Sequence, residues 1–179
     1  MSEPGKILTI VVCAAGPAGD VGRLVALAQG EGWTVQVIAT PPALGFIDVP
    51  RLEQQTGRPV RSRYRNPGEP RSPRADAIIV APATYNTINK FAQGTADTYA
   101  LGVLSEAPGL GIPVVVLPFV NSALASRAPF LRSVESLRSE GVRVLLGPGM
   151  FEPHPPSTGG DRFSSYPWAL ALREIARTV

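Results

Sequence analysis

Short apolar runs alternate with amphipathic stretches along this chain of 179 residues. Continuous runs rich in Val and Ile predict buried strands, whereas apolar residues that recur every three or four positions predict helices. The pattern predicts six strands, at Ile7–Ala14, Thr34–Thr40, Pro59–Tyr64, Ala77–Ala81, Pro113–Leu117 and Val142–Leu146. Alternating charges in the third of these runs favour a place near the sheet edge.

Helical spacing falls between the strands. It predicts helices at Asp20–Gln29, Tyr85–Gln93, Thr98–Glu106, Arg127–Glu140 and Pro167–Val179, with one or two short turns within Pro41–Thr56. Strands that alternate with helices predict an α/β fold, a single-domain Rossmann-like (flavodoxin-like) doubly wound parallel sheet of about six strands. We expect residues 1–179 to form this one domain, with a long loop at 147–166 before the closing helix at 167–179.

Composition supports a globular protein, because 44% of the residues are hydrophobic and 17% are charged. Met1–Lys6 is polar, and no apolar stretch approaches the roughly 20 residues of a membrane span. We therefore expect a cytoplasmic protein with no membrane partner. The net charge is +3, with many of the arginines between positions 58 and 74. Tyr64 is the only aromatic residue among them, which favours a solvated or subunit-facing surface over nucleic-acid binding.

Two residue types that often carry chemistry occur once each. Cys13 lies inside the first predicted strand, which excludes an intramolecular disulfide and indicates a buried structural thiol. His154 lies in the Pro- and Gly-rich loop. One histidine without a cysteine pair leaves little material for a metal site, and we expect none.

The segment Ala77–Thr87 is the most informative one. An apolar strand stops at Pro82, and Thr84, Asn86 and Thr87 follow where an amphipathic helix begins. Free N–H groups, the positive end of the helix dipole and hydroxyl donors converge at such a junction, which predicts an anion site. The alternative is that Thr84 only caps the helix.

Two other predicted strands end in small or hydroxylic residues. Ala15–Gly19 follows the first strand with little side-chain bulk, and Thr40 ends the second. One compact phosphate at the carboxyl edge of the sheet would explain all three strand ends. The spacing differs from G-x-G-x-x-G and no acidic residue ends the second strand, so a mononucleotide such as FMN fits better than NAD. The alternative for the first loop is a plain tight turn.

Pro82–Thr87 resembles the PASANT motif of the homo-oligomeric flavin-containing cysteine decarboxylases, a family that includes phosphopantothenoylcysteine and peptidyl-cysteine decarboxylases. Ala75-Asp76 before the motif and Ile88–Ala92 after it agree with the family as well. The resemblance implies FMN at the positions Ala15, Gly16, Pro17, Thr40, Phe46, Ala83, Thr84, Thr87 and Phe119. It also implies trimers, often assembled into dodecamers, with the flavin at a subunit interface. In the family, the flavin oxidises a cysteine thiol and carbon dioxide is then lost to give an enethiol.

Three regions depart from the family pattern. The window Asn66–Ser72, where the family has its active-site histidine, contains none. Pro118–Ala125, the counterpart of the motif PxMNxxMW, retains Asn121, which the resemblance places at the substrate carboxylate. The flap region Glu152–Arg162 lacks the cysteine of phosphopantothenoylcysteine decarboxylases, which disfavours coenzyme A biosynthesis. The candidate catalytic residues are Asn121, Asn86 and His154, the last either entering the site from the flap or remaining a solvated loop residue.

Three functions remain open at this point. The first is an FMN-dependent decarboxylase or oxidoreductase that acts on a small molecule or peptide carrying a thiol or a carboxylate, such as a C-terminal cysteine. The second is an FMN-binding carrier, sensor or assembly partner without decarboxylase activity. The third is a prenyl-FMN synthase-like transferase, for which Arg127 and Arg162 are candidate phosphate ligands.

Overall fold

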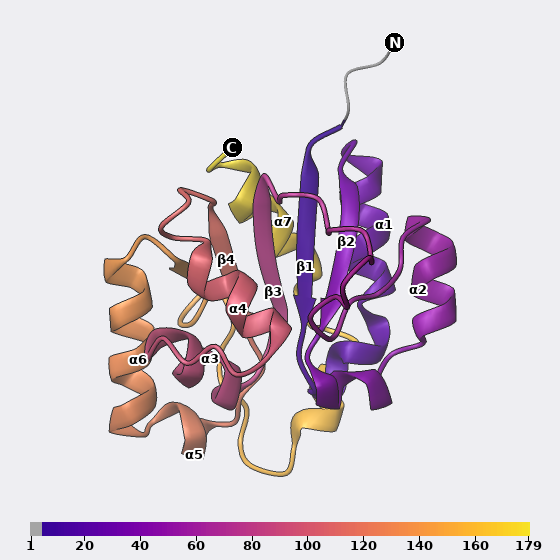
Figure 1. Ribbon diagram of the computed structural model, residues 1–179. Coiled ribbons are helices and arrows are strands. Elements are labelled where there is room, and N and C mark those ends of the chain that lie inside the picture. Colours follow the sequence, from indigo (N-terminus) through magenta and orange to yellow (C-terminus); the bar gives the residue numbers. More distant parts are fainter. Residues whose placement is uncertain (1–4) are drawn as a thin grey trace.

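The computed structural model describes residues 5–179, and the polar start at residues 1–4 lies outside the described part (Figure 1). Five parallel strands form one sheet in the order β2-β1-β3-β4-β5. Their bounds are β1 Ile7–Val12, β2 Thr34–Ala39, β3 Ala77–Ala83, β4 Val114–Pro118 and β5 Arg143–Val144. The predicted α/β parallel sheet is confirmed, with five strands where about six were expected.

Helices cover both faces of this sheet. α1 (Gly22–Gly30) and α7 (Trp168–Ala176) pack against each other on one face, and α3 (Tyr85–Ala92), α4 (Tyr99–Glu106) and α6 (Ala128–Ser139) cover the other (Figure 1). α2 (Val49–Thr56) contacts α1 and β2, and α5 (Ser122–Ala125) is a single turn before α6. Three short 3-10 helices complete the set: η1 Gly16–Asp20, η2 Pro41–Gly45 and η3 Gly159–Arg162.

The core lies between these two helical layers and the sheet. All seven residues of β3 and all five of β4 are buried, which fits strands covered on both faces and accounts for their continuous apolar sequences. Amphipathic helices supply the other half of the packing, with Leu24 of α1, Ile88 of α3 and Ile175 of α7 almost fully buried. This rigid centre fixes the positions of the loops at the carboxyl ends of the strands.

The predicted strand Pro59–Tyr64 is wrong. Only Arg61 pairs with the sheet: its N–H donates to the Val37 carbonyl (3.1 Å) and its carbonyl accepts from Ala39 N–H (2.7 Å). Pro59 has no N–H to donate, and the arginines beyond Arg61 turn toward solvent. The segment therefore adds one bridge to the exposed edge of β2 instead of a sixth strand.

The long loop 147–166 runs beneath the carboxyl edge of the sheet before the chain returns as α7 (Figure 1). Parallel bridges join Leu146 to Phe151 and Asn121 to His154. At its far end, the Tyr166 hydroxyl donates to the Leu117 carbonyl at 2.6 Å. These contacts hold the loop against β4 and the segments that follow β4 and β5.

Within residues 5–179, no helix is both long and apolar enough to cross a membrane. The same residues contain no group of three or more His, Cys, Asp or Glu side chains placed to hold a metal ion.

Candidate functional site

The order of the strands locates a binding site. The chain moves from β1 outward to β2, then back past β1 to β3, so the direction of winding reverses between β1 and β3. Parallel α/β sheets bind ligands at the carboxyl ends of the strands beside this reversal. Here those ends lead to Ala14 after β1 and to Thr84 after β3.

A cavity of about 410 Å³ opens at this point, and we call it the cofactor cavity. Its volume lies within the range of small-molecule sites, roughly 300–1,000 Å³. It brings together four of the predicted site residues, Thr40, Thr84, Asn86 and Thr87. The remaining lining residues are Ala14, Pro41, Pro42, Lys90, Thr98 and Leu101.

Thr84 caps α3, as the alternative interpretation required. Its Oγ1 accepts a hydrogen bond from Thr87 N–H at 3.2 Å and donates to Thr87 Oγ1 at 3.1 Å. The capping role does not remove the anion site, because the hydroxyl proton of Thr87 and the first N–H groups of the helix have no acceptor within the helix. Hydroxyls and the positive end of α3 therefore face one cavity.

Lys90 also lines the cofactor cavity, and the sequence interpretation did not name it as a candidate. It lies one helical turn after Asn86, and its Nζ is 2.5 Å from Asp97 Oδ2. Residues four apart lie on the same face of a helix, so the spacing from Asn86 was a signal that could have found it. Its ammonium group, which is paired with the Asp97 carboxylate, places N–H donors beside the hydroxyl groups of the cavity.

Cys13 lies beneath the cavity and is fully buried. Burial raises the pKa of its thiol, although hydrogen bonds with Thr87 and Thr84 act in the opposite direction. A neutral buried thiol is a poor nucleophile, which agrees with the structural role expected for this residue.

Two further predicted residues, Phe119 and His154, lie in an aromatic cluster that we call the flap cluster. Its other members, Phe151, Phe163 and Tyr166, were not predicted as site residues. The Phe119 ring is central, with its centroid 4.8 Å from that of His154 and 5.8 Å from that of Phe163. His154 is only 6% exposed, so it is not a solvated loop residue. Its Nδ1 is buried and has no hydrogen-bond partner in the described part of the chain.

The electrostatics of His154 favour a neutral imidazole. Burial lowers its pKa below the usual 6.5, and the positive charge of Arg162 lowers it further. A neutral imidazole with a free ring nitrogen is able to accept a proton near pH 7.

Asn121 adjoins His154 through the backbone. Ser122 N–H donates to the His154 carbonyl at 2.8 Å, and Asn121 Oδ1 accepts from Leu124 N–H at 2.9 Å to cap α5. The cap occupies the oxygen of the amide group, so its NH₂ group is the part suited to a carboxylate. The structure thus joins two of the three candidate catalytic residues, while Asn86 lines the cofactor cavity.

Gly16 connects the first loop to the flap cluster. A Cβ added there would come within 1.9 Å of Phe163 Cε1, so the absence of a side chain allows the ring to lie directly on the loop. Ala15 and Pro17 are buried beside it, and Ala83 is buried at the end of β3. Phe46 lies apart from the cofactor cavity, half exposed at the end of η2, with its carbonyl near Gly19.

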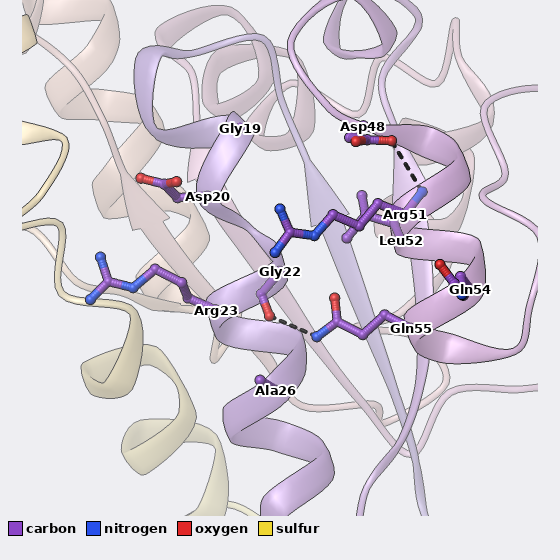
Figure 2. Close-up of a pocket in the computed structure, with 10 residues that line it drawn as sticks. All are labelled: Gly19, Asp20, Gly22, Arg23, Ala26, Asp48, Arg51, Leu52, Gln54 and Gln55. Carbon is purple, nitrogen blue, oxygen red and sulfur yellow. Dashed lines mark hydrogen bonds between the residues drawn. The ribbon is translucent and has the colours of Figure 1, made fainter.

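A larger cavity of about 540 Å³ lies elsewhere, between α1 and α2 (Figure 2). Gln55 Nε2 donates to the Gly22 carbonyl across it, and Asp48 caps α2 by accepting from Arg51 N–H. Negatively charged carboxylates and positively charged guanidinium groups both line this cavity. It includes none of the predicted site residues. Size alone therefore does not identify the site, whereas the strand reversal does.

Comparison with known proteins places the chain in a family. The Flavoprotein family model matches residues 2–159. The coenzyme A biosynthesis bifunctional protein CoaBC of Escherichia coli K12 is 29% identical over 155 residues, which are 83% of this chain and 37% of that protein. The chain thus spans little more than a third of this relative.

Solved structures share the fold over nearly the whole chain. The FMN-dependent cysteine decarboxylase TvaF from thioviridamide biosynthesis is 25% identical, with a TM-score of 0.73 over 96% of this chain and 98% of TvaF. The FMN-dependent cysteine decarboxylase SpaF, at 24% identity, has a TM-score of 0.70 over 96% and 97% of the two chains. Because the Flavoprotein family model covers most of the length of the chain, the chain belongs to the Flavoprotein family.

Proposed function

We propose that this protein binds FMN in the cofactor cavity. The convergence of Thr84, Thr87 and the start of α3 with the Lys90 ammonium in one cavity is the observation that carries the proposal. Hydroxyl donors, free N–H groups and a cation form a set that suits a phosphate ester. The flavodoxin-like strand order binds FMN at the same reversal between β1 and β3 in other proteins.

The reaction that we propose is oxidative decarboxylation of a substrate with a cysteine-like end, a thiol and a carboxylate on neighbouring carbons. Bound FMN would supply the two-electron oxidant for the thiol-bearing carbon. The TvaF neighbour, which is named as an FMN-dependent cysteine decarboxylase, supports this substrate class. Asn121, with its amide NH₂ group free, is suited to hold the carboxylate until carbon dioxide leaves.

His154 is the base that we assign to this reaction. Its neutral imidazole has a free Nδ1 and lies beside Asn121, so a thiol proton has an acceptor next to the carboxylate site. Positioned general bases contribute about 10²–10⁴-fold to rate.

Glu69, in the window where the resembled family has histidine, is a poor base. Its carboxylate accepts from Arg63 at 2.9 Å and from Asn66 N–H at 3.0 Å. These bonds lower the pKa of Glu69 to about 2, so it stays ionised and has little affinity for a proton at neutral pH.

The first experiment is the visible absorption spectrum of the purified protein, with the released chromophore identified by mass. Incubation of the holoprotein with a cysteine-ending peptide should then yield a product lighter by carbon dioxide and two hydrogen atoms. The same peptide with a C-terminal amide is the matched control and should be unchanged. A colourless protein that takes up no added FMN would refute the cofactor assignment.

An FMN-binding protein without decarboxylase activity is the second candidate. Glycine or glutamate at the position of the family histidine, Gly68 or Glu69, favours it, because the Glu69 carboxylate is held in an ion pair with Arg63 and is a poor base. Bound FMN without any change in the peptide would support this candidate over the first.

We propose further that the protein assembles as a trimer or a dodecamer of single-domain subunits in the cytoplasm. The resemblance to homo-oligomeric decarboxylases supports this assembly. Light scattering of the purified protein measures the mass directly, and a monomer would overturn the proposal.

A further inference from the structure

A third cavity, of about 200 Å³, lies between the loop 61–72 and the start of α4. We call it the arginine cavity, because four guanidinium groups and two tyrosine rings line it: Arg61, Arg63, Arg65, Arg71, Tyr64 and Tyr99. The tyrosine rings pack edge to face with centroids 5.4 Å apart. Tyr99 also donates through its hydroxyl to Ser72 at 3.1 Å, which fixes one wall.

The charge of this segment differs from that of the rest of the chain. Positions 58–74 contain six arginines and one glutamate, whereas the remaining residues contain eleven basic and thirteen acidic side chains. The positive charge of the protein is therefore concentrated at this loop. A concave surface lined by one sign of charge concentrates the field and attracts ligands of the opposite sign.

The single carboxylate does not neutralise the cavity. Glu69 is bound by Arg63 and by both nitrogens of Asn66, with Arg61 3.9 Å away. Arg65 donates only to the Glu69 carbonyl, at 3.3 Å, and Arg71 has no hydrogen bond or ion pair within the described residues. Arg65 and Arg71 therefore retain most of their N–H donors while they line the same cavity, and such donors suit an oxyanion.

The position of the arginine cavity links it to the cofactor cavity. Thr98 and Leu101 line the cofactor cavity, and Tyr99 of the same helical turn lines the arginine cavity. On the other side, Arg61 bridges to Ile38 at the end of β2, two residues before Thr40. One ligand spanning the start of α4 would thus reach both cavities.

We infer that the arginine cavity is a binding site for an oxyanion, a carboxylate or a phosphate group, on the molecule that reacts at the flavin. The oxyanion site stands on the arginine geometry, and its assignment to the reacting molecule rests on the proposed function. Arg65 and Arg71 provide the binding donors, and the Arg63–Glu69 ion pair holds the loop that carries them. The loop that lacks the family base serves recognition instead of proton transfer.

The direct test is titration of the purified protein with inorganic phosphate and, separately, with acetate, followed by ³¹P and ¹³C NMR. Excess FMN is included to fill the cofactor cavity. The double variant Arg65→Gln/Arg71→Gln should lower the affinity for one of these ions by about tenfold or more. Arg173→Gln, an exposed arginine of α7 on the opposite face of the sheet, is the matched control and should bind as the wild type does.

The ion with the larger loss identifies the chemistry, phosphate or carboxylate. Unchanged binding of both ions in the double variant would overturn the site. Loss of the oligomeric state in the variant, or binding of a single-stranded oligonucleotide without binding of phosphate, would also overturn it, by assigning the arginines to a subunit interface or to nucleic acid.

The assignment to the reacting molecule has its own test. On cysteine-ending peptides that carry an added phosphate or carboxylate, the variant should raise KM and leave kcat and the FMN spectrum unchanged. A kcat loss with unchanged KM would refute this assignment. Failure of the proposed function would appear separately, as a protein without FMN.

Discussion

The cofactor cavity and the flap cluster border the same edge of the sheet, but they are built in different ways. The anion-binding end of the cofactor cavity depends on neighbouring residues in the sequence: β3 ends at Ala83, and Thr84 caps the helix that follows. The flap cluster depends on side chains of the long loop, because His154 and Phe163 pack against Phe119, which lies more than thirty residues earlier in the sequence. The first kind of site is specified locally, whereas the second requires the whole fold.

The largest effect should come from the flap cluster. His154→Gln keeps a polar side chain of similar reach but removes the basic nitrogen, so turnover of a cysteine-ending peptide should fall about 10²–10⁴-fold. The cofactor cavity contains no part of His154, so the absorbance of bound FMN should be unchanged. Stopped-flow absorbance measures both the amount of bound FMN and the rate at which the peptide reduces it.

Asn121→Ala is the comparison for that experiment. It should raise KM for the peptide through the lost carboxylate contact, and it also removes the α5 cap.

For the His154→Gln variant, turnover equal to that of the wild type would exclude the histidine as the base. The flap cluster would then have only a structural role.

Substitution of Gly16 tests whether the first loop and the flap cluster depend on each other for stability. Gly16→Ala places a methyl group where the Phe163 ring lies, so it should destabilise the protein by about 1–3 kcal/mol, as overpacking does. Phe163→Ala removes the opposing ring, and the double variant should recover part of the loss. Urea unfolding of all four proteins gives the coupling energy, and strictly additive effects would mean that Phe163 moves aside freely.

Thr84→Val tests the cofactor cavity with a smaller expected effect. Valine keeps the branched shape but loses the hydroxyl, which removes the α3 cap at a cost of about 1 kcal/mol. The affinity for FMN should fall by about tenfold. Thr84→Ser restores the hydroxyl and should recover most of the affinity in a fluorescence titration, whereas FMN occupancy that is unchanged in Thr84→Val would contradict the phosphate assignment.

The cofactor cavity and the flap cluster also differ in how much of each could be predicted from the sequence. Apolar runs and cap residues placed β3, α3, Thr40 and Thr84 correctly at one edge, because strand ends and helix starts depend on neighbouring residues. The strand predicted at Pro59–Tyr64 does not form, because Pro59 has no N–H to donate to a ladder, and the alternating charges alone do not indicate this cost. The packing of Phe163 on Gly16 leaves no local pattern, and the burial of His154 follows from contacts with Phe119 that no spacing encodes.

The smallest effect should be the pH dependence of stability that His154 confers. Because folding lowers its pKa below 6.5, the unfolded chain binds more protons as the pH falls through this region. The contribution of His154 is therefore fully present above pH 6.5 and declines as the pH falls through the lower pKa of the folded state. Glu69, whose pKa is lowered to about 2, acts only in a separate window below pH 4.5. Urea midpoints between pH 5 and 8 should slope in the wild type and flatten in His154→Gln. An equal slope in both proteins would mean that folding leaves the pKa of His154 unchanged, which would contradict its burial in the flap cluster.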